Sequence, residues 1–290
     1  MDPLMAVWIL KGANSLYYGL RSTVDNLSHA VEVLDPRVVA GMFANTPAAS
    51  GTTEDSYENK SPDVLTKHSV ATALLAHWLD NRSRKEPGCA FTAGLMHDIG
   101  KHVFALNHPD EAAKIYSASS LWDNFSHTDL LSVEQLFFGL DHTEVGEFVA
   151  RKMHFPEPLA QVFRTHHDPA SLPPYHRVYR MSQIVNAASL GATALGYAAG
   201  IPVSREQCTQ DGRWERLVEE GIVPDKTTEN LLENIRLQKS RIESYLDLES
   251  PLPDIPRPSH STRAAAERDA SPRPSGSGPP SGIGRASRVT

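Results

Sequence analysis

The chain has 290 residues, enough for one or two domains, and 40% of them are hydrophobic, which is ordinary for a globular protein. Its two cysteines, Cys89 and Cys208, form neither a thiolate metal site nor a disulfide framework, so we expect a reducing, cytoplasmic location. The net charge is −7, but residues 250–290 carry six Arg against three acidic residues, which leaves −10 for residues 1–249. So acidic a body argues against duplex nucleic acid as a ligand.

The first residues, MDPLMAVWILKG, are apolar but lack the positive charges that begin a signal peptide. They predict a helix instead, with Asp2 as its N-cap and Pro3 at its first position. A second apolar stretch, residues 181–203, is interrupted by polar residues and glycines, so it predicts a buried helix followed by a loop. No membrane span is expected.

Up to residue 249 the apolar positions recur every three or four residues, which predicts helix almost throughout. The segment SPDVLTKHSVATALLAHWLD predicts a helix with Ser61 as N-cap and Pro62 at the first position. His68 shares the core-facing stripe of this helix with Leu65, Thr72, Leu75 and Leu79.

Residues 92–103, TAGLMHDIGKHV, place His97 and Asp98 inside an apolar run. Burying a carboxylate without a partner costs several kcal/mol or more, so Asp98 must be exposed, paired or bound to a metal. Helical spacing turns further histidines inward, and the predicted core cluster is His68, His97, Asp98, His142, His166 and His167. The other histidines are interpreted as ordinary residues. Imidazoles with one carboxylate suit zinc, iron or manganese.

The adjacent His-Asp pair in GLMHDIGK, preceded by His68 and followed by His142 and a His-His pair, resembles the HD phosphohydrolase superfamily. The N-terminal DPLMAVWILKGANSLYYGL, with its Asp-Pro and Asn-Ser pairs, is similar to the first segment of HDOD domains, the output branch of that superfamily. The resemblance covers roughly residues 1–200. It implies an all-α, HD-domain-like helical bundle that is usually linked to signalling proteins. Many members of this family act by binding rather than by catalysis.

The resemblance also implies roles for individual residues. His68, His97 and Asp98 match the first three HD positions. His142, His166 and His167 match the additional histidines of the related HD-GYP phosphodiesterases. Lys101 matches a lysine that approaches a substrate phosphate in those enzymes, and a solvated helix cation is an equally weighted alternative.

Two departures argue against the enzymatic interpretation. Superfamily enzymes have a closing Asp on a later helix, but this chain has no acidic residue between Asp168 and Glu206, and Asn186 falls where that Asp would be. The stretch after the paired histidines, HHDPASLPPYH, lacks the Gly-Tyr-Pro segment of HD-GYP enzymes. One metal, or none, is therefore expected rather than two.

The sequence thus predicts an HDOD-type signalling module whose cluster binds a divalent Fe, Mn or Zn ion and which acts through protein contacts. The alternative is a metal-dependent phosphohydrolase or phosphodiesterase with Asp98 and Lys101 as catalytic residues. The predicted parts are an N-terminal helical subdomain at 1–55, an HD-like core at 56–200, a helical extension at 201–249 and a tail at 250–290. The tail holds eight of the 21 prolines and is predicted to be disordered.

The N-terminal helix raises one further expectation. Typical HDOD domains have one or two helices before the Asp-Pro pair, so the N-terminal part resembles a truncated one. A helix that carries Leu4, Met5, Val7, Trp8, Ile9 and Leu10 is apolar over more than one face. We therefore expect either that the natural chain starts upstream of Met1 or that this helix docks onto a signalling partner or a second copy of itself.

Overall fold

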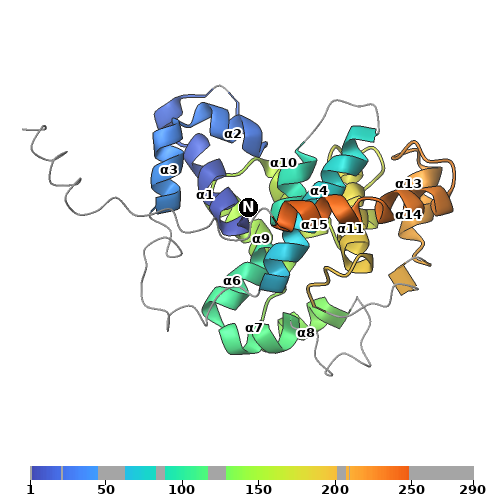
Figure 1. Cartoon of the computed structure of the whole chain (residues 1–290). Coiled ribbons are helices and arrows are strands. Elements are labelled where there is room, and N and C mark those ends of the chain that lie inside the picture. The colour runs from blue at the N-terminus through green and yellow to red at the C-terminus, as the bar shows by residue number, and fades with distance from the viewer. Residues whose placement is uncertain are drawn as a thin grey trace, which may run out of the picture. The chain divides into compact units, whose positions relative to one another are not determined.

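The structure, a computed structural model, describes residues 2–20, 22–44, 63–82, 89–116, 129–200, 207–208 and 210–247 (Figure 1). In these segments every regular element is helical, which confirms the predicted all-α fold. The helices are α1 Pro3–Ala13, α2 Leu27–Val33, α3 Pro36–Ala44, α4 Asp63–Arg82, α5 Ala90–Met96, α6 Ile99–Asn107, α7 Pro109–Tyr116, α8 Asp129–Phe138, α9 His142–Lys152, α10 Glu157–Thr165, α11 Tyr179–Ala194, α13 Arg213–Glu219, α14 Thr228–Arg236 and α15 Lys239–Asp247, with short 3₁₀ turns η1 Leu16–Tyr18 and η4 Pro169–Ser171.

Helix α4 is the central element, and it packs against α5 on one side and α11 on the other. The stripe predicted for it is confirmed, since Leu65, His68, Thr72, Leu75 and Leu79 are all buried. The predicted caps Ser61 and Pro62 lie outside the described residues, as does the tail from Ser250. A long helix buried on two sides gives His68 a fixed position in the core.

Helices α2 and α3 pack against α1, and the three helices lie together in Figure 1. The predicted cap is confirmed, because the Asp2 carboxylate accepts a hydrogen bond from the Leu4 amide at 2.8 Å and Pro3 is the first helical residue. Asn14 then ties the following loop to α1, since its side chain donates to the carbonyl of Val24 at 2.8 Å and accepts from the Val24 amide at 2.7 Å.

Helix α1 is covered more completely than its sequence suggested. Contacts with α2, α3, α5 and α6 bury Met5, Val7, Ile9 and Leu10. Trp8 remains 49% exposed, with the Lys11 ammonium 4.8 Å from its ring centroid. Among the described residues of α1, the exposed apolar surface is therefore smaller than expected and is centred on Trp8. Docking of a partner through this helix stays a prediction.

The C-terminal helices α13, α14 and α15 share a core with α4 and α11. Trp214 and Leu217 of α13, Ile235 of α14 and Ile242 of α15 are buried against this core. The apolar stretch at 181–203 proves to be mostly the buried helix α11, as predicted. None of the described helices is both long and apolar enough to cross a membrane.

One glycine sets how closely α6 approaches α9. A Cβ atom at Gly100 would overlap the carbonyl oxygen of His142, the first residue of α9. The backbones of these two helices therefore touch at this point, and only glycine fits. The contact joins the turn that carries Asp98 to the helix that carries His142.

We predict that Gly100→Ala lowers the thermal midpoint by several degrees or more, because an overpacked backbone contact costs roughly 1–3 kcal/mol or more. Gly146→Ala is the matched control, since its Cβ would meet Phe163 at an ordinary 3.5 Å and alanine favours helix. Thermal unfolding followed by circular dichroism measures both variants. Equal midpoints for the two would contradict the close approach.

Candidate metal centre

The six residues singled out in the sequence meet in one buried cluster, although they come from distant parts of the chain. His68 lies in the middle of α4, His97 and Asp98 form the tight turn between α5 and α6, and His142 begins α9. His166 and His167 directly follow α10. All are buried except His167, which is partly exposed. Their oxygen and nitrogen atoms form two groups that share Asp98, each compact enough to hold an ion.

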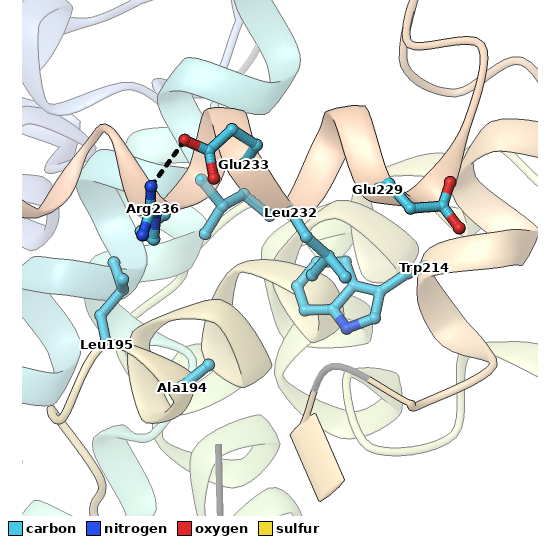
Figure 2. Close-up of a pocket in the computed structure, with 8 residues that line it drawn as sticks. Ala194, Leu195, Trp214, Glu229, Leu232, Glu233 and Arg236 are labelled. Carbon is cyan, nitrogen blue, oxygen red and sulfur yellow. Dashed lines mark hydrogen bonds and ion pairs between the residues drawn. The ribbon is translucent and has the colours of Figure 1, made fainter. Parts of the chain in front are cut away.

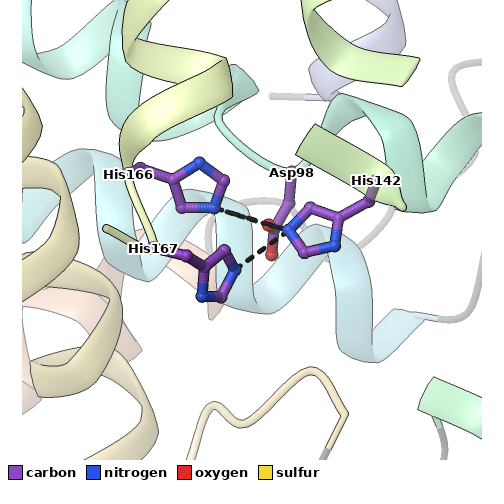
Figure 3. A group of neighbouring side chains, drawn as sticks. All are labelled: Asp98, His142, His166 and His167. Carbon is purple, nitrogen blue, oxygen red and sulfur yellow. Dashed lines mark hydrogen bonds and ion pairs between the residues drawn. The ribbon is translucent and has the colours of Figure 1, made fainter. Parts of the chain in front are cut away.

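The first group, Asp98 with His142, His166 and His167, is shown in Figure 3, where the three rings surround the Asp98 carboxylate. The Asp98 Oδ1 atom lies 3.2 Å from His142 Nε2 and 3.5 Å from His166 Nε2. His142 Nε2 in turn lies 3.5 Å from His166 Nε2 and 3.0 Å from His167 Nε2. A tetrahedral ion with bonds of about 2.0–2.1 Å separates neighbouring ligand atoms by about 3.3–3.4 Å, and these four distances lie close to that value.

The second group holds the other oxygen of Asp98. The Oδ2 atom lies 3.3 Å from His97 Nε2 and 3.6 Å from His68 Nε2. The Lys101 ammonium lies closer still, at 2.7 Å from Oδ2, and also donates to the carbonyl of Ala199 at 3.3 Å. The interpretation of Lys101 as a solvated helix cation is therefore wrong, because the residue is only 3% exposed, whereas a role toward a substrate phosphate stays a prediction.

In four of the five rings the Nδ1 atom, which points away from the cluster, lies within hydrogen-bond distance of a protein oxygen. The Nδ1 atoms of His68, His97 and His166 lie 2.6 to 2.9 Å from the carbonyl oxygens of Tyr197, Gly94 and Phe163 respectively. His142 Nδ1 faces the Glu134 carboxylate at 2.6 Å. A ring that donates through Nδ1 keeps a lone pair on Nε2 when it is neutral. The lone pairs of four imidazoles thus point toward the cluster.

Burial keeps most of these rings neutral. Desolvation lowers the pKa of His68 to about 4, holds those of His97 and His167 well below the usual range, and lowers that of His166. Burial alone would raise the pKa of Asp98, but His97 and Lys101 together with hydrogen bonds hold it well below its usual range. At neutral pH Asp98 is therefore an ionised carboxylate and His68, His97, His166 and His167 are neutral imidazoles, which are the forms that bind metals. His142 is the exception, because its pKa is raised, and it would release a proton on binding an ion.

Such an arrangement of acceptors is unfavourable without a cation. Lone pairs on neighbouring nitrogens repel one another and the carboxylate, and unsatisfied buried acceptors cost about 1–3 kcal/mol each. In the described part of the chain, His97 Nε2 and Asp98 Oδ1 are buried with no hydrogen-bond partner. Asp98 Oδ1 belongs to the first group, and a buried acceptor without a partner there is the observation that most directly favours a metal.

Glu134 of α8 is a functional residue that the sequence interpretation missed. Its carboxylate is fully buried and accepts hydrogen bonds from the His142 backbone amide at 2.8 Å and from the Tyr116 hydroxyl at 2.7 Å. Burial opposes a charge on His142, but the carboxylates of Glu134 and Asp98 together outweigh burial and raise the pKa of His142. Leu130 is also buried and lies one helical turn before Glu134. An acidic residue on an apolar stripe was therefore the available signal.

The position of Asn186 also differs from the expectation. Its side-chain amide donates to the backbone carbonyl of His166, and its oxygen accepts from Arg213 at 3.4 Å. Asn186 thus holds the backbone of His166 at the end of α10, and its oxygen is paired with Arg213. Ser189, one turn later on α11, has its hydroxyl 3.2 Å from His68 Nε2. Ser189 is thus the α11 residue whose side chain contacts the ring of a cluster histidine, and it is no carboxylate either.

Two surface pockets lie apart from the cluster and share none of its residues. The first, shown in Figure 2, has a volume of about 200 Å³ and lies between the end of α11, at Ala194 and Leu195, and α14, with Trp214 at its floor. The second is next to Tyr17 and Tyr18 of η1 and the start of α3. Neither gives a substrate access to Asp98.

Comparisons with known proteins agree with the geometry. The sequence profile of the HDOD domain matches residues 1–169. An uncharacterized protein of Treponema pallidum is 22% identical over 169 residues, or 58% of this chain and 32% of that protein. The chain thus spans about a third of the length of this curated relative.

Two crystal structures show the same fold. The MmoQ response regulator of Methylococcus capsulatus is 21% identical, with a TM-score of 0.53 over 67% of this chain and 74% of that one. A virulence factor of Campylobacter jejuni is 18% identical, with a TM-score of 0.55 over 82% of this chain and 81% of that one. At these identities the likeness shows the fold alone.

We predict that the metal-free protein loses stability as the pH falls from 6.5 toward 4. Burial lowers the pKa of both His68 and His102 from 6.5 to about 4, so the unfolded chain takes up protons that the folded chain refuses. Each group then lowers the free energy of unfolding by on the order of 3 kcal/mol across this window. Denaturant unfolding at a series of pH values measures the slope. His102→Gln should make it shallower, and an unchanged slope would contradict the prediction.

Proposed function

Because the chain belongs to the HDOD domain family, we propose that it is a signalling output module that contacts protein partners and holds one divalent metal in its His/Asp cluster. The observation that carries the metal is the buried Asp98 Oδ1 atom, which has no hydrogen-bond partner among the described residues and has His142 Nε2 and His166 Nε2 at 3.2 and 3.5 Å. The likeness to a response regulator, MmoQ, supports the signalling role. The likeness does not identify a partner, so we propose only that the partner is a protein.

The charges favour a single ion. The cluster and its immediate surroundings contain two carboxylates, Asp98 and Glu134, and one ammonium, Lys101, which together carry −1 when the imidazoles are neutral. One dication changes this to +1, whereas two would leave +3 in a buried site. The group formed by Asp98 Oδ1, His142, His166 and His167 would hold the ion, because Lys101 already occupies the other oxygen. Nitrogen-rich ligands of this kind suit Zn²⁺, Fe²⁺ or Mn²⁺.

Metal-dependent phosphohydrolysis remains the second candidate, favoured by the complete set of five histidines and Asp98. A dication bound there would act as a Lewis acid toward a phosphate ester. Two features count against this function. The cluster is buried except at His167, and the Lys101 ammonium, the group proposed to meet a phosphate, is engaged by Asp98 and Ala199. We therefore favour binding over catalysis.

We predict about one equivalent of transition metal in protein purified without added metal, and its loss in Asp98→Asn and in His142→Ala. His29→Ala, at an exposed histidine, is the matched control and should keep the metal. Elemental analysis measures the metal, and an assay with bis(p-nitrophenyl) phosphate and Mn²⁺ or Fe²⁺ measures hydrolysis. Metal without turnover is the expected result. Turnover that disappears in Asp98→Asn would favour the hydrolase, and full metal retention in both variants would exclude the cluster.

Glu134 is predicted to set the metal affinity by orienting His142. Glu134→Gln should weaken binding roughly 10–100-fold, because a carboxylate on the far nitrogen fixes the ring and makes it more basic. Tyr116→Phe removes one hydrogen bond to the same carboxylate and should have a smaller effect. Competition with a chromophoric chelator gives the affinities. Glu243→Gln, at an exposed ion pair with Lys239, is the control, and equal affinities for Glu134→Gln and the control would refute the role.

A further inference from the structure

The half of the cluster around His68 and His97 has the composition of a metal site, yet it already contains a cation. His68 Nε2, His97 Nε2 and Asp98 Oδ2 form a group of three ligand atoms. The Lys101 ammonium lies 2.7 Å from the same Oδ2 atom. We propose that Lys101 is a built-in cation that closes this second metal subsite and thereby limits the cluster to one ion. The inference rests on the proposed metal binding and adds to it.

Lys101 is fixed in this position by its surroundings. It follows Asp98 by three residues at the start of α6, which brings its side chain back over the carboxylate. The Ala199 carbonyl accepts a second hydrogen bond from the ammonium at 3.3 Å, and the ring centroid of Tyr116 lies 5.9 Å away. The side chain is only 3% exposed, so water does not screen its charge.

The two oxygens of Asp98 therefore have different environments. Oδ1 has no hydrogen-bond partner and faces His142 and His166, whereas Oδ2 is paired with the ammonium. A dication bound to Oδ2 at about 2.0–2.2 Å would lie within a few Å of Lys101, and two unscreened positive charges at that distance repel strongly. Lys101 thus admits a metal on one side of the carboxylate and excludes it on the other.

The two histidines of the second group, His68 and His97, differ in whether Nε2 has a hydrogen-bond partner. His68 Nε2 has the Ser189 hydroxyl at 3.2 Å as a partner, so it needs no ion. His97 Nε2 has no hydrogen-bond partner among the described residues and lies 3.3 Å from Asp98 Oδ2. Removing the ammonium would leave two imidazoles and a free carboxylate oxygen, a set that binds divalent transition metals. A substitution that removes the Lys101 ammonium should therefore allow the second subsite to bind an ion.

The test is the metal stoichiometry of the full chain saturated with Mn²⁺. The unaltered protein should bind about one Mn²⁺, and Lys101→Met, which keeps an unbranched side chain but removes the terminal ammonium, should bind about two. Two ions that share Asp98 would be magnetically coupled, so the Mn²⁺ electron paramagnetic resonance spectrum should change from that of isolated ions to that of a coupled pair. Lys101→Met with His97→Ala should return to about one, because His97 belongs only to the second group.

Lys101→Gln is a second neutral variant, and circular dichroism shows whether each variant is folded. One ion in both folded neutral variants would overturn the inference, and so would two ions in the unaltered protein, whatever the variants do. One ion in the unaltered protein and two in either neutral variant would support it. No bound Mn²⁺, Zn²⁺ or Fe²⁺ in any of these proteins would instead defeat the proposed metal binding, so the two failures are distinguishable.

Discussion

The buried carboxylate of Asp98 is the charge around which this centre is arranged. Removing an ion from water costs several kcal/mol unless it is paired and hydrogen bonded. Lys101 meets that requirement for one oxygen only. The other oxygen faces the Nε2 atoms of His142 and His166, whose Nδ1 atoms are engaged by Glu134 and by the Phe163 carbonyl, so a cation would complete this side of the carboxylate. The unpaired acceptors around a buried carboxylate are the physical basis for the proposed metal.

The fold and the centre depend on the same backbone contact. Asp98 lies in the turn before α6, and Gly100 lets this helix touch the first residue of α9, which is His142. The residues from His68 to His167 must also be brought together across most of the helical core, at the entropic cost of closing long loops. The centre is therefore a property of the folded chain, and tight packing of α6 against α9 is needed for its geometry.

Helical periodicity was sufficient to predict much of this centre. His68 could be placed because Leu65, Thr72 and Leu75 define a stripe, and that stripe is buried. The adjacent His97 and Asp98 stood out because polar residues in an apolar run are unfavourable unless they are paired or bind a ligand. These inferences depended on local spacing, which the tertiary structure preserved.

Three features could not be predicted in the same way, each for a physical reason. Glu134 was overlooked because glutamate is almost always exposed, and its burial depends on Tyr116 and His142 from other helices. Asn186 was placed by its position along the chain, whereas the rotation of α11 about its axis brings Ser189 to His68. The spacing of Lys101 from Asp98 was visible, but its burial under Ala199 and Tyr116 is a tertiary effect.

The position of the ligands gives the signalling hypothesis a physical form. An ion bound by Asp98, His142, His166 and His167 would link the turn before α6, the start of α9 and the end of α10. A ligand that binds only the assembled arrangement stabilises it by mass action, so metal occupancy and the packing of α9 and α10 must be coupled. Helix α9 carries Phe148, which is largely exposed, on its outer side. The same helix therefore joins the buried centre to a surface on which a protein partner could sense its state, and this requires no substrate to enter the cluster.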